Sequence, residues 1–137
     1  GSGMALGSIE GRVAIEYFDD GENSGVAETR KKYAFKCHRI GDAVYPVNAV
    51  AFHPVHETLA TGGADGTCVI WDAVHKKRLT AIQPRFPSGI AAITFSADGK
   101  EVAVASSYTF EEGERDAGSP DEIYVREVLD VECRPKK

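Results

Sequence analysis

Four residues near the middle of the chain are of types that bind metal ions: Cys37, His38, His53 and His56. Structural zinc sites combine one Cys pair with a second Cys or His pair at characteristic spacings, and these four residues do not follow that pattern. The cysteines are three in number, an odd count at no ligand spacing, which is typical of reduced thiols in an intracellular protein. We therefore predict no metal site and no cofactor.

Nucleophilic catalysis has little support in the sequence. Ser106 and Ser107 follow an apolar run, but no Gly-x-Ser-x-Gly turn presents either hydroxyl. Neither a His-Glu-x-x-His motif nor a phosphate-binding glycine loop occurs. A non-enzymatic protein is the prediction, and a hydrolase built on the same fold stays open as a weak alternative.

The stretch Tyr45 to Asp72 gives the clearest indication of the fold. It contains an apolar strand, a second strand that ends in a turn containing Asp65-Gly66, and a third strand that ends in Trp71-Asp72. An Asp-Gly pair supplies the positive φ angles of a tight hairpin. Three strands with these endings, within about 40 residues, are the signature of one WD-repeat blade. We interpret Asp65, Gly66, Trp71 and Asp72 as structural residues of that blade.

A similar pattern restarts after the central stretch, so the chain contains an internal repeat. The segment 90–95 corresponds to 47–52, and 102–106 corresponds to 58–61. Propellers close with typically about four to eight blades, and 137 residues hold only about three. The prediction is an all-β, partial WD-repeat β-propeller.

The expected boundaries follow from this repeat. They are 1–7 for a leader outside the fold, 8–137 for the partial propeller, and within it 8–44 for the last strands of one blade, 45–82 for a complete blade and 83–137 for a final blade without its outer strand. The segment 40–44 is expected to be a connecting loop, and 109–120 a long acidic loop in place of a tight hairpin. Long loops on a rigid scaffold often carry function.

Charge and hydropathy narrow the class of partner. The net charge of −5 argues against a globally basic grip on nucleic acid. No apolar run approaches the 18 or so residues of a membrane span, and the leader lacks the features of a signal peptide. We expect neither direct nucleic-acid binding nor a membrane.

Several stretches resemble one family of known proteins. The sequence resembles the C-terminal part of the Bub-three spindle-checkpoint family over 8–137, and the sister Rae-one messenger-RNA export family shares several of the stretches. The matching stretches are 8–14, 32–39, 45–49, 60–66, 70–72 with 76–79, and 105–108. The stretch 51–56 is closer to the export family, whereas 32–39 and 76–79 favour the checkpoint family.

The resemblance implies a seven-bladed propeller that acts by capturing peptides. Members of the family bind a GLEBS peptide of a checkpoint kinase or pseudokinase across one face and dock it onto phosphorylated Met-Glu-Leu-Thr motifs of a kinetochore scaffold. It implies the nucleus, the kinetochore in mitosis and the cytoplasm as locations. The alternative is an adaptor that holds a nucleoporin's GLEBS peptide in messenger-RNA export.

The resemblance also implies which residues touch the peptide. Arg39 matches the position expected to pair with the phosphothreonine, where a guanidinium suits phosphate oxygens. The expected second basic position is Glu57, whose carboxylate would repel a phosphate, although Lys36 could substitute. The loop that touches the partner contributes Tyr108, Phe110 and Glu111.

The terminal blades would expose apolar edges and faces if these blades are made alone. Such edges pair readily with a second copy or with the missing blades. We therefore expect the fragment to self-associate.

Overall fold

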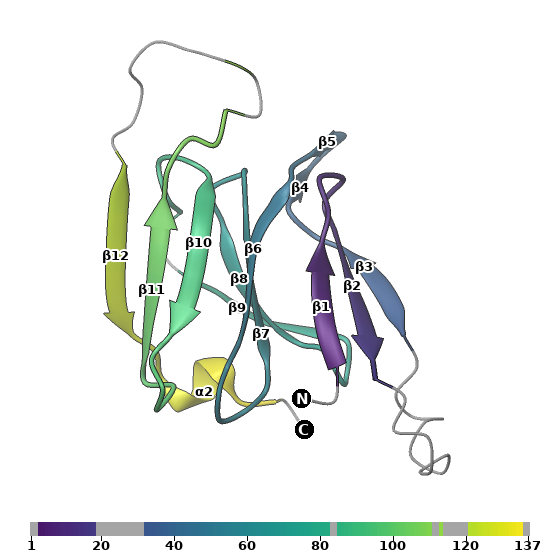
Figure 1. The fold of residues 1–137 in the computed structure, drawn as a ribbon, viewed down its shortest axis with the longest axis vertical. Coiled ribbons are helices and arrows are strands. Elements are labelled where there is room, and N and C mark those ends of the chain that lie inside the picture. Colours follow the sequence, from purple (N-terminus) through teal and green to yellow (C-terminus); the bar gives the residue numbers. More distant parts are fainter. Residues whose placement is uncertain (1–2, 19–31, 83–84, 111–112, 114–120, 136–137) are drawn as a thin grey trace.

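The structure is a computed structural model, and it describes residues 3–18, 32–82, 85–110, 113 and 121–135. Three antiparallel sheets stand side by side, with the central one between the other two (Figure 1). The prediction of an all-β partial propeller is confirmed. In the described part of the chain, no helix is long and apolar enough to cross a membrane.

The central sheet has four strands in sequence order, and all of them lie within the expected range 45–82. They are β6 (Val47–Phe52), β7 (Leu59–Gly63), β8 (Cys68–Asp72) and β9 (Lys77–Ala81). Every residue of β7 is buried, because sheets cover both of its faces. A Cβ atom at Gly62 would lie 2.4 Å from Cγ2 of Ile90 on the neighbouring sheet, so only glycine fits there without a shift.

The first sheet consists of β1 (Gly3–Gly7), β2 (Arg12–Tyr17) and β3 (Tyr33–Lys36). The expectation that residues 1–7 lie outside the fold is wrong for Gly3–Gly7. Met4 pairs with Glu16 and Leu6 with Ala14, and the turn closes at Gly11, whose φ of 64° favours glycine. The run Gly-Met-Ala-Leu-Gly has no β-branched residue and therefore gave no strand signal.

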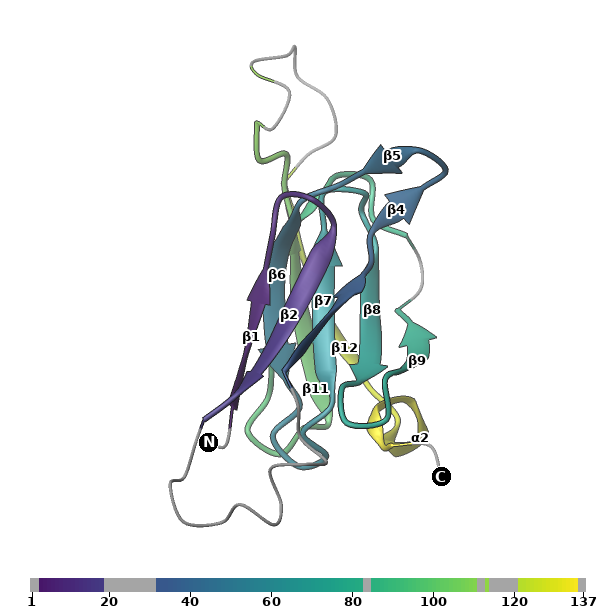
Figure 2. The same ribbon diagram turned by 90° about the vertical axis from the view of Figure 1, so that its right-hand side faces the viewer.

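The segment 40–44 also differs from its expected loop. It takes part in a short hairpin of β4 (Arg39–Ile40) and β5 (Ala43–Val44), which turns at Gly41 with a φ of 57°. This hairpin projects beyond the sheets, at the same end as residues 107–110 (Figure 2).

The third sheet has three strands, β10 (Ile90–Phe95), β11 (Glu101–Ser106) and β12 (Glu122–Glu127). A single helical turn, α2 (Asp130–Cys133), follows β12 and packs against β8 and β9. Among the described residues, no fourth strand joins this sheet.

Two apolar clusters hold the sheets together. One lies between the first and central sheets and includes Val13, Ile15 and Leu59; the other lies between the central and third sheets and includes Ile70, Ile90 and Val104. In β2 and β11 the buried residues alternate with more exposed ones, as expected for strands with one covered face. This packing fixes the ends of the strands, where the polar residues gather.

Candidate functional site

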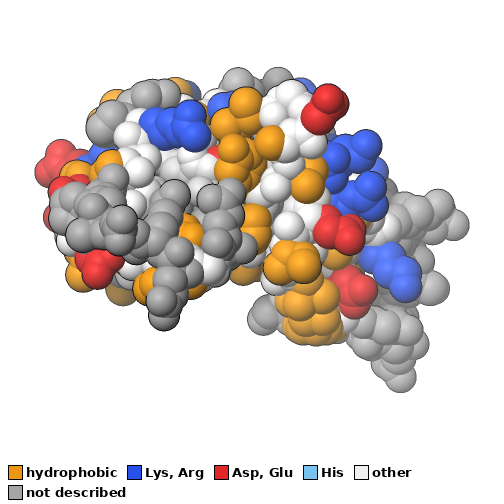
Figure 3. Space-filling view, turned by 90° about the horizontal axis from the view of Figure 1, so that it is seen from above, with side chains coloured by type: hydrophobic (Ala, Val, Ile, Leu, Met, Phe, Trp, Pro, Cys, Tyr) orange, Lys and Arg blue, Asp and Glu red, His pale blue; other side chains and the backbone are white. Residues whose placement is uncertain are grey.

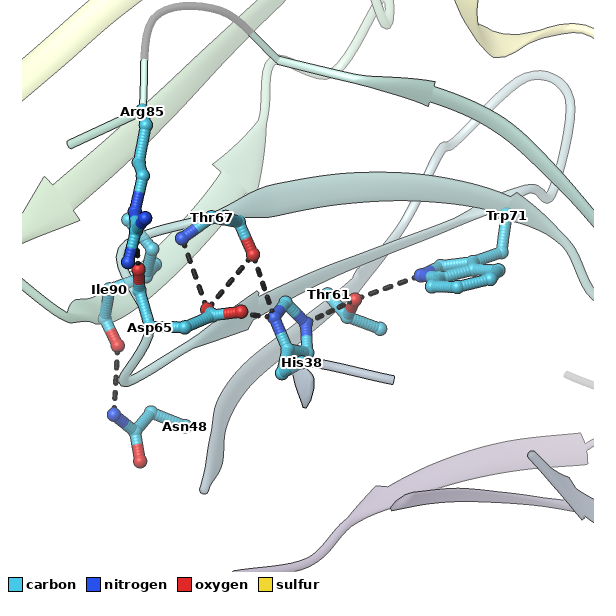
Figure 4. Close-up of polar contacts among 8 residues, drawn as sticks. All are labelled: His38, Asn48, Thr61, Asp65, Thr67, Trp71, Arg85 and Ile90. Carbon is cyan, nitrogen blue, oxygen red and sulfur yellow. Dashed lines mark hydrogen bonds and ion pairs between the residues drawn. The ribbon is translucent and has the colours of Figure 1, made fainter. Parts of the chain in front are cut away.

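A buried polar cluster lies at one end of the central sheet (Figure 4). His38, from the segment between β3 and β4, has Nδ1 3.0 Å from Oδ1 of Asp65 in the β7–β8 turn. Its Nε2 lies 2.8 Å from Oγ1 of Thr61 on β7, and Trp71 on β8 donates its indole N–H to the same hydroxyl at 2.9 Å. The side chains of His38 and Asp65 are 0% and 4% exposed.

The proton positions in this cluster follow from Asp65. An ionised carboxylate only accepts hydrogen bonds, so Nδ1 of His38 carries a proton and donates to Asp65. Thr67 donates to Asp65 from both its backbone N–H and its hydroxyl. Burial acts to raise the pKa of Asp65, but the hydrogen bonds and the charge of His38, together with the bonds from Thr67, outweigh it and lower the pKa. All of these groups are engaged with one another.

Of the four residues interpreted as structural, Asp65, Gly66 and Trp71 lie in or next to this cluster, and Asp72 ends β8 at the opposite end of the sheet. A Cβ at Gly66 would lie 2.6 Å from the carbonyl oxygen of Phe86, and its φ is 81°. The Trp71 ring packs on Phe35 of the first sheet, with centroids 4.9 Å apart. Asp72 accepts hydrogen bonds from the backbone N–H groups of residues 74 and 75.

Sequence reasoning missed His38 and Thr61 as members of this cluster. His38 is 23 residues from Thr61 and 27 from Asp65, and a hydroxyl within an apolar strand resembles any other β-branched residue. A histidine just before a predicted blade and a threonine at the end of its second strand were the available signals.

Arg39 lies beside this cluster, at the same end of the sheets. Its guanidinium donates from Nη2 to the carbonyl oxygen of Glu10 at 3.0 Å and from Nε to that of Gly11 at 3.3 Å. Both acceptors belong to the β1–β2 turn. The side chain is half-buried, so the turn holds the guanidinium at the surface in a fixed position.

Lys36 is exposed at the end of β3, where it pairs across the strands with the exposed Arg12. Two cations therefore occupy neighbouring positions next to the segment that carries Arg39. This pairing makes the edge of the first sheet basic within a chain of net charge −5.

The loop after β11 presents an aromatic pair. The rings of Tyr108 and Phe110 have centroids 5.2 Å apart, and Phe110 is 65% exposed. The Tyr108 hydroxyl donates to the carbonyl oxygen of Gly113, whose N–H donates to the carbonyl of Phe110. Phe110 has a φ of 60°, an uncommon angle for a bulky residue. Glu111 lies outside the described residues.

The structure brings Arg39 and Phe110 to the same end of the molecule, with the start of β6 between them. On one side, Val47 donates its N–H to the carbonyl of Ser8, in the turn that holds Arg39. On the other side, Asn48 donates to the carbonyl of Ile90 at 3.1 Å and to the Thr109 hydroxyl at 3.4 Å. Through the start of β6, these contacts link the β1–β2 turn to the loop that carries Tyr108 and Phe110.

The surface at this end combines apolar and basic side chains. Ile9, Ile40 and Val44 are 78%, 48% and 47% exposed on the β1–β2 turn and the β4–β5 hairpin. Seen from this end, hydrophobic side chains gather in the middle of the face, and Lys and Arg side chains lie beside them (Figure 3). An extended peptide with apolar and anionic groups would find complementary chemistry here.

Glu57 lies at the opposite end of the sheets from Arg39. It is in the β6–β7 turn, next to the Phe52–Leu59 pair, whereas Arg39 is near the Val47 end of β6. A six-residue strand is roughly 17 Å long. The Glu57 carboxylate is therefore not beside a phosphate bound at Arg39, and a basic residue at that position could not share the phosphate.

The remaining histidines have structural partners. His53 is buried, and its Nδ1 accepts the N–H groups of Val55 and His56, so its Nε2 donates to the carbonyl of Gly99 at 2.8 Å. His56 pairs with Asp130 of α2 at 2.5 Å. Among the described residues, no group of three or more His, Cys, Asp or Glu side chains is placed to hold a metal ion.

Comparison with known proteins adds an independent line of argument. The family model described as "WD domain, G-beta repeat" matches residues 30–72, the part that contains the buried polar cluster. The chain is 54% identical over 140 residues to "Mitotic checkpoint protein BUB3.1" of Arabidopsis thaliana, covering 99% of the chain and 39% of that protein.

Two further relatives carry names that describe different functions. "Mitotic checkpoint protein bub3" of Dictyostelium discoideum is 50% identical over 94% of the chain and 38% of its own length. "mRNA export factor GLE2" of Chaetomium thermophilum is 38% identical over 98% of the chain and 38% of its own length. The chain spans about two fifths of the length of these relatives, so what the whole proteins do reaches it only by inference.

Proposed function

Since the chain belongs to the WD-repeat proteins of the Bub3 kind, we propose that it forms part of a non-enzymatic spindle-checkpoint adaptor. In this proposal it contributes to binding the GLEBS peptide of a checkpoint kinase or pseudokinase and to docking that peptide on phosphorylated Met-Glu-Leu-Thr motifs at the kinetochore. The protein would act in the nucleus, at the kinetochore in mitosis and in the cytoplasm.

The observation that carries the proposal is the position of Arg39 and Phe110 at the same end of the sheets. Phe110 offers an exposed aromatic anchor, the kind of side chain that dominates peptide interfaces. Arg39 offers a guanidinium that the β1–β2 turn already orients, so little side-chain entropy is lost when it binds a phosphate. The start of β6 lies between the two.

Binding rather than catalysis also fits the polar cluster at this end. His38, Thr61 and Asp65 are residue types that recur in hydrolases, but here they are buried and bonded to one another and to Trp71. A substrate could not reach the imidazole without separating the β7–β8 turn from the segment before β4. The cluster therefore supports a role in holding the face in shape.

Peptide binding measured by fluorescence anisotropy tests the proposal. We expect Phe110→Ala to weaken binding of a checkpoint-kinase GLEBS peptide at least about tenfold, as for an interface hot spot. Arg39→Glu should abolish binding of a phosphorylated Met-Glu-Leu-Thr peptide and leave GLEBS binding within about twofold. Arg78→Glu, at an exposed position of β9, is the matched control for the charge reversal.

The outcomes separate the candidate functions. Loss of phosphopeptide binding in Arg39→Glu but not in Arg78→Glu supports the checkpoint role, and Arg39→Lys, which keeps the charge, shows whether the paired N–H groups matter. The similarity to an mRNA export factor makes a nucleoporin's GLEBS peptide the second ligand to test. Preference for that peptide, with no response to phosphorylation, would favour the export adaptor. A chain that binds none of these peptides would contradict both proposals.

A further inference from the structure

Asn48 is the extra residue of a β-bulge at the start of β6. Val47 pairs with Gly63 of β7, and Ala49 pairs with the adjacent Gly62, so Asn48 has no partner across the two strands. A bulge bends the strand locally and redirects the side chain of the extra residue. The side chain of Asn48 is exposed, on the face proposed above to bind peptides.

The third sheet contains the same kind of bulge with a different residue in it. β10 and β11 pair with a register shift between Ile90 and Ala92, so Ala91 is the extra residue there. Ala91 corresponds to Asn48 in the internal repeat, and its methyl group neither donates nor accepts a hydrogen bond. The bulge does not require an amide side chain, so the amide of Asn48 serves contacts outside the strand pairing.

Two hydrogen bonds fix the orientation of this amide. Nδ2 of Asn48 donates to the carbonyl oxygen of Ile90 at 3.1 Å and to the hydroxyl of Thr109 at 3.4 Å. A carbonyl oxygen cannot donate, so the nitrogen of the amide, and not its oxygen, faces Ile90. Oδ1 points away from that carbonyl (Figure 4), and no hydrogen bond joins Oδ1 to another described residue.

An exposed oxygen held in a fixed position is suited to bind the backbone of an extended peptide. Oδ1 only accepts, so the ligand group beside it must be a donor, and a peptide backbone carries an N–H at every residue except proline. Because the protein already orients the amide, little side-chain freedom is lost on binding. The start of β6 lies between Arg39 and Phe110, so a peptide that reaches from one to the other passes Asn48.

We propose that Asn48 is a peptide-binding residue, whose Oδ1 accepts a hydrogen bond from a backbone N–H of the GLEBS peptide where that peptide crosses the start of β6. This contact rests on the proposed peptide-binding function and adds to it a residue that recognises the backbone. It does not depend on the side chains of the peptide. Asn48 therefore holds the peptide extended across the face, while Phe110 and Arg39 select its sequence.

Amide-to-ester substitution in the peptide tests the contact. An ester replaces one backbone N–H by an oxygen, and a series of GLEBS peptides with one ester each is measured against the parent chain and Asn48→Leu, a substitution of similar volume without polar atoms. At one position the ester should weaken binding to the parent about fivefold, as for one lost neutral hydrogen bond. There it should weaken binding to Asn48→Leu by less than about twofold. At the other positions the ester should affect both proteins equally.

A second variant separates the Oδ1 contact from an effect on the loop after β11. Asn48→Leu also removes the Nδ2 hydrogen bonds, and this change could shift the loop that carries Phe110. Thr109→Val removes one acceptor of Nδ2, whereas the carbonyl of Ile90 still orients the amide. Thr109→Val should therefore keep the ester sensitivity of the parent at the position that Asn48→Leu identifies.

Two results would overturn this role of Asn48 and leave the proposed function standing. If every ester affects the parent and Asn48→Leu equally, Oδ1 receives no N–H from the peptide. If Thr109→Val loses the position-specific sensitivity as Asn48→Leu does, Asn48 acts by placing the loop and not through a contact of its own. A parent chain that does not bind the all-amide GLEBS peptide contradicts both the contact and the proposed function.

Discussion

His38 Nδ1 lies 3.0 Å from Oδ1 of Asp65, and this contact ties the segment after β3 to the β7–β8 turn. The next residue after His38 is Arg39, whose guanidinium holds the β1–β2 turn. The residue interpreted as a phosphate contact is thus one peptide bond away from a buried, fully engaged imidazole. Changes in the cluster should therefore reach the proposed binding face through His38.

We expect Thr61→Val to destabilise the chain by about 2 kcal/mol. The substitution keeps the shape of the side chain but removes the hydroxyl, so the Trp71 indole N–H and Nε2 of His38 both lose their partner. Urea unfolding followed by Trp71 fluorescence measures the change. Thr94→Val, at an exposed position of β10, is the matched control and should change stability by less than about 0.5 kcal/mol. Equal effects of the two substitutions would contradict the structural role of Thr61.

The lowered pKa of Asp65 predicts that the folded chain loses stability in acid. Its pKa is lower in the folded chain than the ordinary value of 3.8, so the carboxylate stabilises the fold fully above that value. The contribution is lost as the pH falls below about 4 and through the folded-state pKa. Unfolding free energy should therefore drop more steeply in this range for the parent than for Asp65→Asn, whose side-chain oxygen still accepts from His38. Asp42→Asn, an exposed carboxylate in the β4–β5 turn, controls for lost charge.

Most of the strands could be predicted from local pattern. Apolar residues at Val13 and Ile15, and at Val102 and Val104, point to one buried face in each strand, and the structure buries them. The β7–β8 turn follows from its Asp-Gly pair. β1 could not be predicted, because its small and flexible residues become a strand only when β2 pairs with them.

The candidate site was less predictable than the fold. The link from Asn48 to Thr109 joins residues 61 positions apart on different sheets, and nothing local in either segment indicates it. The separation of Arg39 from Glu57 likewise depends on which end of β6 each residue meets. The two residues are only 18 positions apart in the sequence. Because β6 runs between them, they lie at opposite ends of the central sheet.

The tether of α2 to the central sheet gives a local prediction. The Thr58 hydroxyl donates to the carbonyl of Cys133 at 2.5 Å, and both residues are buried. Thr58→Val leaves that carbonyl without its partner, so we expect α2 to open more often while the sheets stay intact. Hydrogen exchange should show faster exchange at residues 132–134, by about tenfold or more, with β7 and β11 unchanged. Uniform loss of protection across the sheets would instead mean that α2 unfolds together with the core.

The three thiols should be unreactive in the folded chain. Burial is the main cause that raises the pKa of Cys37 and of Cys68 to about 12 and that of Cys133 to about 11. The thiolate is the reactive form, so at pH 8 almost none is present, and the sulfurs are also shielded from reagents. A disulfide reagent such as Ellman's should therefore titrate three thiols at once in guanidinium and only slowly in buffer. Cys37 should react first, because it is 6% exposed against 0% for the other two. A thiol that reacts within seconds in buffer would show that one of the two apolar clusters opens readily.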